Sequence, residues 1–424
     1  MFYAKAILVI LFIFVLAKEI NKQKRDHTLL LFLILCGIYI FGKVVLEIVF
    51  DYGSLRKINF FVDYTLSDQT EYRVLTSLYI FLTAVIFSGH LPNLRFSWRL
   101  PTIKIIKNGN TVMLIITGLI FAYYISTRLL FVLNFGYNEY QNGGFGTKPI
   151  LIFVCEQIFW LLIFQKLQKS NSHTKRRILL YLIISILTLD MLTGKRGTAA
   201  IQLVIVIYIM NNLGLIKISL LKSLILAIGF IFILDFIGEV RHSAQRGFES
   251  YSFKDAGLVF FDEQASSLNT LAYAVEYSET SAISSYNLRS FFADIFILWE
   301  KIYVKLGLSK ATTLEEKAKK FGYSGYILTN EADPYLLSQG KSIGTSFITE
   351  LWLLGREFLV FFGSIILCVF LRSVDIKRYD MLAVNLILVP DLVYLARMSF
   401  GSVIVLNVFA ILLLLINGLR IRLR

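Results

Sequence analysis

The chain has 424 residues, of which 56% are hydrophobic and only 17% are charged, so it is not an ordinary soluble domain. This composition indicates a polytopic membrane protein. The net charge of +14 would suggest nucleic-acid binding in a soluble chain. In a membrane protein it indicates basic cytoplasmic loops instead, and we expect no nucleic-acid partner.

Apolar runs long enough to cross a bilayer occur about eleven times along the chain. The first is followed by basic residues and by no small-residue cleavage site, so we expect a spanning helix and not a cleaved signal peptide. The predicted fold class is therefore all-α, a polytopic helical membrane bundle. The predicted spans are 2–16, 28–50, 74–91, 112–135, 149–165, 178–193, 198–216, 220–238, one within 346–371, 381–395 and 402–418.

A long polar segment interrupts these spans. We expect 1–238 to hold the first eight helices, 239–345 to form one large loop, and 346–424 to hold the last three helices. About a hundred residues between two spans is too long for a simple connection. The segment is therefore expected to be partly helical and to fold over the outer mouth of the bundle, and its run 315–320 has the composition of a solvated helix.

The Lys and Arg residues alternate between the two sides of the predicted membrane. Loops 18–27, 92–111, 166–177, 213–222 and 372–380, with the residues after 418, hold 21 of them. The short loops on the opposite side hold 7. The positive-inside rule then predicts an external N-terminus, a cytoplasmic C-terminus and an external 239–345 loop.

Four short motifs map to this outer face. Lys195 and Arg196 lie between two glycines in a tight turn that joins two spans. The turn is predicted to be external, although the positive-inside rule favours cations on the cytoplasmic side. The structural alternative is a plain hairpin whose cations meet lipid headgroups. Glu239, His242 and Arg246 follow the end of a span at spacings of three and four, so they share one helix face. Its alternative is a helix end with internal ion pairs. Arg241 projects to another side. The remaining motifs are Glu350, where the loop re-enters the membrane, and the pair Asp391 and Arg397 on one helix end.

The cations at the outer mouth suggest a large bound anion. Arginine suits phosphate oxygens because its planar guanidinium donates two parallel hydrogen bonds. We expect no metal or other cofactor, since D-x-D and C-x-x-C motifs are absent and the three cysteines lie in apolar runs. A phosphate-binding P-loop is absent as well, so ATP is not the expected energy source. The candidate anion-binding residues are Lys195, Arg196, Arg241, Arg246 and Arg397.

A general base near these cations would come from four candidates. His242 and Glu239 rank first. The imidazole of His242 stays neutral at neutral pH beside a guanidinium, so it can accept a proton. The cations lower the pKa of the Glu239 carboxylate, but desolvation raises it again. Glu350 and Asp391 follow. Another intramembrane pair, Lys43 and Glu47, is four residues apart and is interpreted as self-neutralising.

The chain resembles the Wzy family, the polymerases of oligosaccharide repeat units in bacterial O-antigen. The resemblance is carried by 193–197, 238–247, 338–355 and 394–400, together with the topology of the whole chain. It implies a multi-pass glycosyltransferase of the bacterial inner membrane that acts at the periplasmic face. The implied donor and acceptor are glycans on undecaprenyl pyrophosphate, with membrane lipids and a chain-length regulator as further partners to consider. Arg196, Arg241 and Arg397 would then hold the pyrophosphates, whereas no family motif identifies the base.

Two other functions use similar residues. An O-antigen ligase would share the donor and differ in the acceptor, and composition does not separate it from a polymerase. A flippase for lipid-linked oligosaccharides, or another transporter, should show inverted repeats and polar residues near the membrane midplane. The chain shows no repeat, and its charges gather toward the outer face.

Overall fold

The structure is a computed structural model. It describes residues 1–22, 27–59, 63–92, 94–98, 109–142, 150–170, 172–193, 196–212, 258, 261–262, 264–310, 312–338, 342–374, 382–408 and 419–423.

Helices occupy the predicted spans that fall within the described residues. Four are long and apolar enough to cross a membrane, namely His27–Phe50, Asp68–Ser88, Thr111–Phe135 and Phe347–Ser373, and Ile387–Ala396 is a shorter apolar helix. The helical class is thus confirmed, whereas the number of eleven spans is not. The predicted span 220–238 lies outside the described residues. The helices of this part are α1 (Phe2–Asn21), α2 (His27–Cys36), η1 (Gly37–Phe41), α3 (Gly42–Phe50), α4 (Asp68–Ser88), α5 (Gly109–Asn142), α6 (Ile150–Lys169), α7 (His173–Leu192), α8 (Arg196–Asn212), α18 (Phe347–Ser373), α19 (Leu382–Val393), η4 (Tyr394–Ala396) and α20 (Phe400–Leu406).

The segment between the spans is also helical where it is described. The run of charges at 315–320 lies in α15 as predicted, and a capping box between Thr313 and Glu316 begins that helix. Gly322, at φ 68°, ends it in the left-handed conformation that glycine adopts easily. The helices of this segment are α11 (Ser266–Glu276), α12 (Ser281–Ser284), α13 (Leu288–Phe291), α14 (Ala293–Lys305), α15 (Leu314–Phe321), α16 (Ser324–Ala332) and α17 (Pro334–Ser338).

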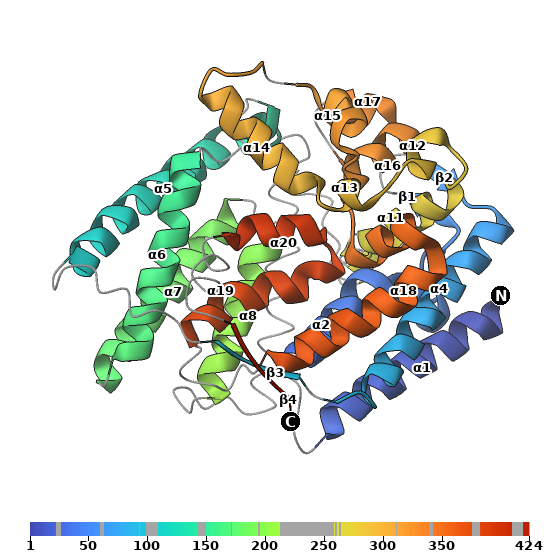
Figure 1. Ribbon diagram of the computed structural model, residues 1–424, viewed down its shortest axis with the longest axis horizontal. Helices are drawn as coiled ribbons and strands as arrows, with labels where there is room; N and C mark the ends of the chain where they lie inside the picture. Colours follow the sequence, from blue (N-terminus) through green and yellow to red (C-terminus); the bar gives the residue numbers. More distant parts are fainter. Residues whose placement is uncertain are drawn as a thin grey trace.

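The long helices form two groups joined by α19 (Figure 1). In one group α4 packs against α18 and α1, while α2 contacts both α1 and α18. The other contains α5, α6 and α7. Helix α19 packs on α6 and α8 on one side and on α2 on the other, so it bridges the groups. Large apolar side chains such as Trp352, Phe32, Phe41 and Phe81 fill the core.

The two ends of the first group differ. Helices α11–α17 gather around the start of α18 and around α20, and α11 also packs on α4 (Figure 1). At the opposite end of α18, two strands that the sequence did not predict form an antiparallel pair, β3 (Leu94–Trp98) with β4 (Leu419–Leu423), in which Phe96 is opposite Ile421. A second antiparallel pair, β1 (Lys57–Asn59) with β2 (Asp63–Thr65), lies in the connection between α3 and α4.

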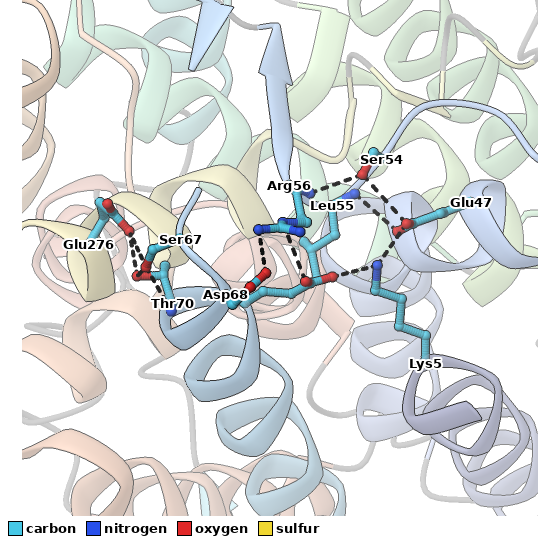
Figure 2. A network of polar contacts seen from close by, with 10 residues as sticks. Lys5, Glu47, Ser54, Leu55, Arg56, Ser67, Asp68, Thr70 and Glu276 are labelled. Carbon is cyan, nitrogen blue, oxygen red and sulfur yellow. Dashed lines mark hydrogen bonds and ion pairs between the residues drawn. The ribbon is translucent and has the colours of Figure 1, made fainter. Parts of the chain in front are cut away.

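Charged side chains connect the helices at each end. Lys5 of α1 binds Glu47 of α3 at 2.7 Å and Glu71 of α4 at 2.6 Å, and Glu71 is also 3.6 Å from Arg56 (Figure 2). The Glu276 side chain of α11 accepts hydrogen bonds from Ser67 and Thr70 at the start of α4 (Figure 2). These contacts connect the segment that holds α11 to the first helix group.

The other end has its own ion pairs. Arg372, at the end of α18, is 3.3 Å from Glu19 of α1 and donates to Ser88 Oγ of α4 at 2.9 Å. Lys22 is 2.6 Å from the same Glu19 carboxylate. Each end of the group therefore pairs buried charges of opposite sign within the protein.

Candidate active site at the start of α18

A buried polar cluster forms where α18 begins beneath the helices of the 239–345 segment. Ser346 caps α18 by accepting a hydrogen bond from Thr349 N at 3.3 Å, and the Thr349 hydroxyl bonds that of Thr270 in α11 at 3.0 Å. This network fixes the first turn of α18, which carries Glu350. The sequence-predicted site residue Glu350 thus lies at the junction of the membrane helices and the loop helices.

Glu350 is completely enclosed, with 1% of its surface exposed. One carboxylate oxygen accepts from Ser324 Oγ at 3.1 Å, and the other accepts from the backbone N–H of Phe400 at 2.9 Å. Both donors are neutral, and no ion pair of Glu350 occurs among the described residues. A buried carboxylate held by neutral donors is expensive, which is typical of functional sites.

A second carboxyl group, Asp294 at the start of α14, lies in the same cluster. It accepts from Ser399 Oγ at 2.6 Å and from Ser402 Oγ at 2.9 Å. Burial raises the pKa of Asp294 above its ordinary value of 3.8, and the two serine hydroxyls counteract this rise only in part. Gly401 permits the close approach, because a Cβ there would come within 3.0 Å of the Asp294 carboxylate.

Aromatic residues pack beside the two carboxyl groups. The rings of Phe291 and Phe400 are stacked with centroids 5.4 Å apart, and the Phe347 ring lies 6.2 Å from that of Phe400. Tyr286 is also buried here, and its pKa is raised well above 10.0, first by desolvation and then by the nearby charge of Glu350. The cluster is therefore a low-dielectric environment in which charges interact strongly.

Arg397 lies three residues before Phe400, close to this cluster along the chain. It donates from Nη1 to Gln264 Oε1, and its guanidinium lies over the ring of Tyr39 in η1 at 5.1 Å. The Tyr39 and Tyr394 rings meet edge to face at 5.7 Å. Because a guanidinium carries five N–H donors in a planar fork, one group can contact an amide, an aromatic face and an anion together.

Asp391 has a different environment. It is buried in α19 and accepts from Asn407 Nδ2 at 2.7 Å, while the same amide donates to the Val403 carbonyl at 3.0 Å. This contact joins α19 to the end of α20 and explains the polar residue structurally.

The remaining predicted site residues are described less fully or not at all. Arg196 is the first residue of α8, and nothing is described of its side chain. Lys195, Glu239, Arg241, His242 and Arg246 lie outside the described residues. The structure therefore places Glu350 of α18 against Phe400 at the start of α20, three residues after Arg397, and leaves the other cations as predictions.

Sequence reasoning missed Asp294, Ser399, Ser402, Ser324 and Gln264. Only Ser399 carried a local signal, since a serine directly before an apolar run is typical of a helix N-cap, and Ser399 does cap α20. A cleft of about 530 Å³ between α6 and α7, lined by Lys166, Lys169 and Lys175, contains none of the predicted site residues.

Comparison with known proteins gives one match. The family model described as O-antigen polysaccharide polymerase Wzy matches residues 1–422. No curated protein and no solved structure matches the chain. Because the match covers nearly the whole chain and agrees with the membrane-length helices, this protein belongs to the Wzy family of O-antigen polysaccharide polymerases and is a multi-pass membrane enzyme that polymerises lipid-linked repeat units.

Proposed function

We propose that this polymerase is a metal-independent glycosyltransferase that works at the periplasmic face of the inner membrane. It moves the growing glycan from undecaprenyl pyrophosphate onto a new lipid-linked repeat unit. The main support is the buried cluster of Glu350 and Asp294 near Arg397, where the loop helices meet α18.

The transfer makes two demands on the protein. The acceptor hydroxyl oxygen bonds to the anomeric carbon of the donor while the bond from that carbon to the pyrophosphate oxygen breaks. The hydroxyl proton passes to a base, and the departing pyrophosphate carries away the electron pair and its negative charge. A carboxylate meets the first demand, and guanidinium groups meet the second.

For the base we propose Glu350 among the described candidates. Its carboxylate is held by a hydroxyl and a backbone N–H, neither of which neutralises it. The Asp391 carboxylate instead fixes Asn407 inside the bundle. In this proposal the acceptor must reach the enclosed Glu350, so the packing beside it, which includes Phe347 and Phe400, has to open when substrate binds. Glu239 and His242 are the alternatives if Glu350 is not the base.

For the pyrophosphate we propose Arg397 together with the cations of the outer mouth. Arg397 is half-buried and oriented by Tyr39 and Gln264, which supports a role in binding a large anion. The other members of this proposed set are Lys195, Arg196, Arg241 and Arg246.

The test is the product made by purified protein from lipid-linked repeat units. A ladder of lengths supports polymerisation, whereas transfer of a single glycan to a lipid A acceptor would favour a ligase. Glu350→Gln should slow the ladder by about 10²–10⁴-fold. Arg397→Lys should leave it well below wild type, because an ammonium lacks the planar fork.

Arg289→Ala is the matched control, since this exposed arginine also lies over an aromatic ring, that of Phe296 at 5.4 Å. Its ladder should equal that of the wild type. If Glu350→Gln keeps the wild-type rate and pH profile, Glu350 is not the base, and Glu239→Gln and His242→Gln are the next variants to measure.

A further inference from the structure

Helix α18 contains a built-in break. The backbone leaves the helical conformation at Gly355 and Arg356, and Arg356 has φ 53° and ψ −149°. A residue other than glycine with positive φ is uncommon and strained, and such strain is concentrated at binding and catalytic sites. A Cβ on Gly355 would lie 2.5 Å from Leu359 Cγ, so this close turn needs a glycine beside the strained arginine.

The break brings two arginines to one tryptophan. The Arg356 guanidinium lies 4.1 Å from the centroid of Trp352, and that of Arg73 in α4 lies 5.7 Å from the same centroid. Trp352 itself is fully buried. Arg356 Nη2 donates to the Ser278 carbonyl at 3.1 Å. Its Nη1, although buried, has no hydrogen-bond partner among the described residues.

The charges at this point do not balance. Glu357 is the carboxylate in contact with the pair, at 3.9 Å from Arg73 Nε. Within the part of the chain that the structure describes, the two guanidiniums share one carboxylate, and one positive charge is left over. Arg372 at the other end of α18 differs in its exposure, because it is 3% exposed and lies 3.3 Å from Glu19, a carboxylate that it shares with Lys22.

The pair lies at the depth of lipid headgroups. Residues 74–88 of α4 and 358–371 of α18 contain no charged side chain. From Arg356 to Arg372 the helix is about 24 Å long at 1.5 Å per residue, which compares with a hydrocarbon core of about 30 Å. Arg73 and Arg356 thus mark one boundary of the apolar layer, and Arg372 marks the other.

The pair also opens toward the lateral surface of the bundle. The Arg73 side chain is 37% exposed. Tyr72 on α4 and Phe358 and Phe362 on α18 are exposed large apolar residues close in sequence to the two arginines. Such a surface contacts lipid chains, and a guanidinium at its edge reaches the headgroup layer, where it can bind an anion.

We propose that Arg73 and Arg356 bind the phosphate group of a membrane lipid at this lateral face. The two guanidiniums donate to the phosphate oxygens, Trp352 orients both arginines, and Phe358 and Phe362 contact the hydrocarbon chain. An acidic phospholipid and the carrier lipid of the substrate both present such a group. The phosphate site itself does not depend on the proposed function. Only the identification of the bound lipid as the carrier lipid rests on that function.

The test measures lipid binding without turnover, by native mass spectrometry of the full-length purified protein. The added lipids are phosphatidylcholine, phosphatidylglycerol and undecaprenyl diphosphate, each in turn. The two acidic lipids should bind more tightly than phosphatidylcholine. Arg73→Gln and Arg356→Gly should each weaken that binding about 10- to 100-fold, the range expected for loss of a charge-assisted hydrogen bond.

The variants are chosen to separate binding from folding. Arg356→Gly removes the guanidinium and also relieves the positive φ, and Arg73→Gln leaves the α18 backbone untouched. Arg289→Ala should bind all three lipids as the wild type does. A preference of tenfold or more for the diphosphate that both arginine variants lose identifies the carrier lipid at this site, and equal binding of the two acidic lipids identifies bulk acidic lipid. The proposal is overturned if both variants bind acidic lipids normally, or if phosphatidylcholine binds equally well.

Discussion

Buried carboxyl groups dominate the chemistry at the residue scale. Glu350 could be singled out from the sequence, because an acidic residue at the start of an apolar span needs an explanation. Asp294 could not, because its partners Ser399 and Ser402 are more than a hundred positions away along the chain. Sequence reasoning therefore found individual charges but not the hydroxyl groups that make them tolerable.

The raised pKa of Asp294 has a consequence for stability. A carboxyl group that binds its proton more tightly in the folded state stabilises the fold below its unfolded pKa. That contribution is lost as the pH rises through the folded pKa, which lies above 3.8. An asparagine side chain does not titrate, so the stability of Asp294→Asn relative to wild type should rise between pH 4 and neutral pH.

Thermal unfolding of both proteins in the same detergent, at pH 4 and at neutral pH, measures this difference. A constant difference across this range would show that the Asp294 carboxyl group is not perturbed by burial.

Helix positions could be predicted at the element scale, whereas interruptions and long-range pairs could not. The last long span, expected within 346–371, is α18 at Phe347–Ser373, because its apolar run is unmistakable. Its break at Gly355 leaves no trace in the hydropathy. Similarly, the spacing alone predicts that Glu47 pairs with Lys43, whereas Glu47 binds Lys5 of another helix and Lys43 donates to Asn269 at 3.2 Å.

The break in α18 requires the glycine. Gly355→Ala places a methyl group 2.5 Å from Leu359 Cγ, so the helix must shift, and overpacking of this kind costs about 1–3 kcal/mol. We expect a lower unfolding temperature for Gly355→Ala than for wild type. Gly118→Ala is the control, because its added methyl group would lie 3.2 Å from the Phe159 side chain and should lower the unfolding temperature less. Gly307→Ala does not serve as a control, because Gly307 has a positive φ that strains any alanine. Equal melting of wild type and Gly355→Ala would contradict the packing around the break.

The Lys5 network joins α1 to α3 and α4. Lys5→Ala leaves Glu71, which is 1% exposed, without its closest cation, and removing one partner of a buried ion pair costs about 3–5 kcal/mol. Chemical or thermal unfolding should register the loss. Lys320→Ala is the control, because Lys320 is 54% exposed and its partner Glu300 keeps the hydrogen bond from Thr312 Oγ1 at 2.7 Å, so we expect a smaller loss. Similar effects of the two substitutions would mean that Lys5 is not part of a buried network.

At the scale of the whole molecule, segments predicted for opposite sides of the membrane lie at different ends. Predicted cytoplasmic segments meet at one end, where β3 pairs with β4 and Arg372 binds Glu19. Helices of the predicted external loop meet at the other end (Figure 1). Hydropathy and charge could predict this separation, but they contain no information on strand pairing between distant segments. Which compartment each end faces stays a prediction.

Thiol labelling of intact cells tests the orientation. We expect Gly194→Cys and Leu308→Cys to react with an impermeant reagent added from outside, because positive-inside bias places both positions there. Leu308 is 67% exposed. The unsubstituted protein is the control, since its cysteines, Cys36, Cys155 and Cys368, are all buried. Labelling that requires opened cells would reverse the orientation and with it the proposed periplasmic activity.

The pairing of β3 with β4 also bears on how the protein is made. Leu94–Trp98 leaves the ribosome early, whereas Leu419–Leu423 follows only after the remaining helices have been synthesised. Until then the edge of β3 has no partner strand, and an open edge can pair with other chains. Closure of this ribbon is therefore expected to be a late event in biogenesis, which makes truncation before β4 a route to misassembly even when every membrane helix is present.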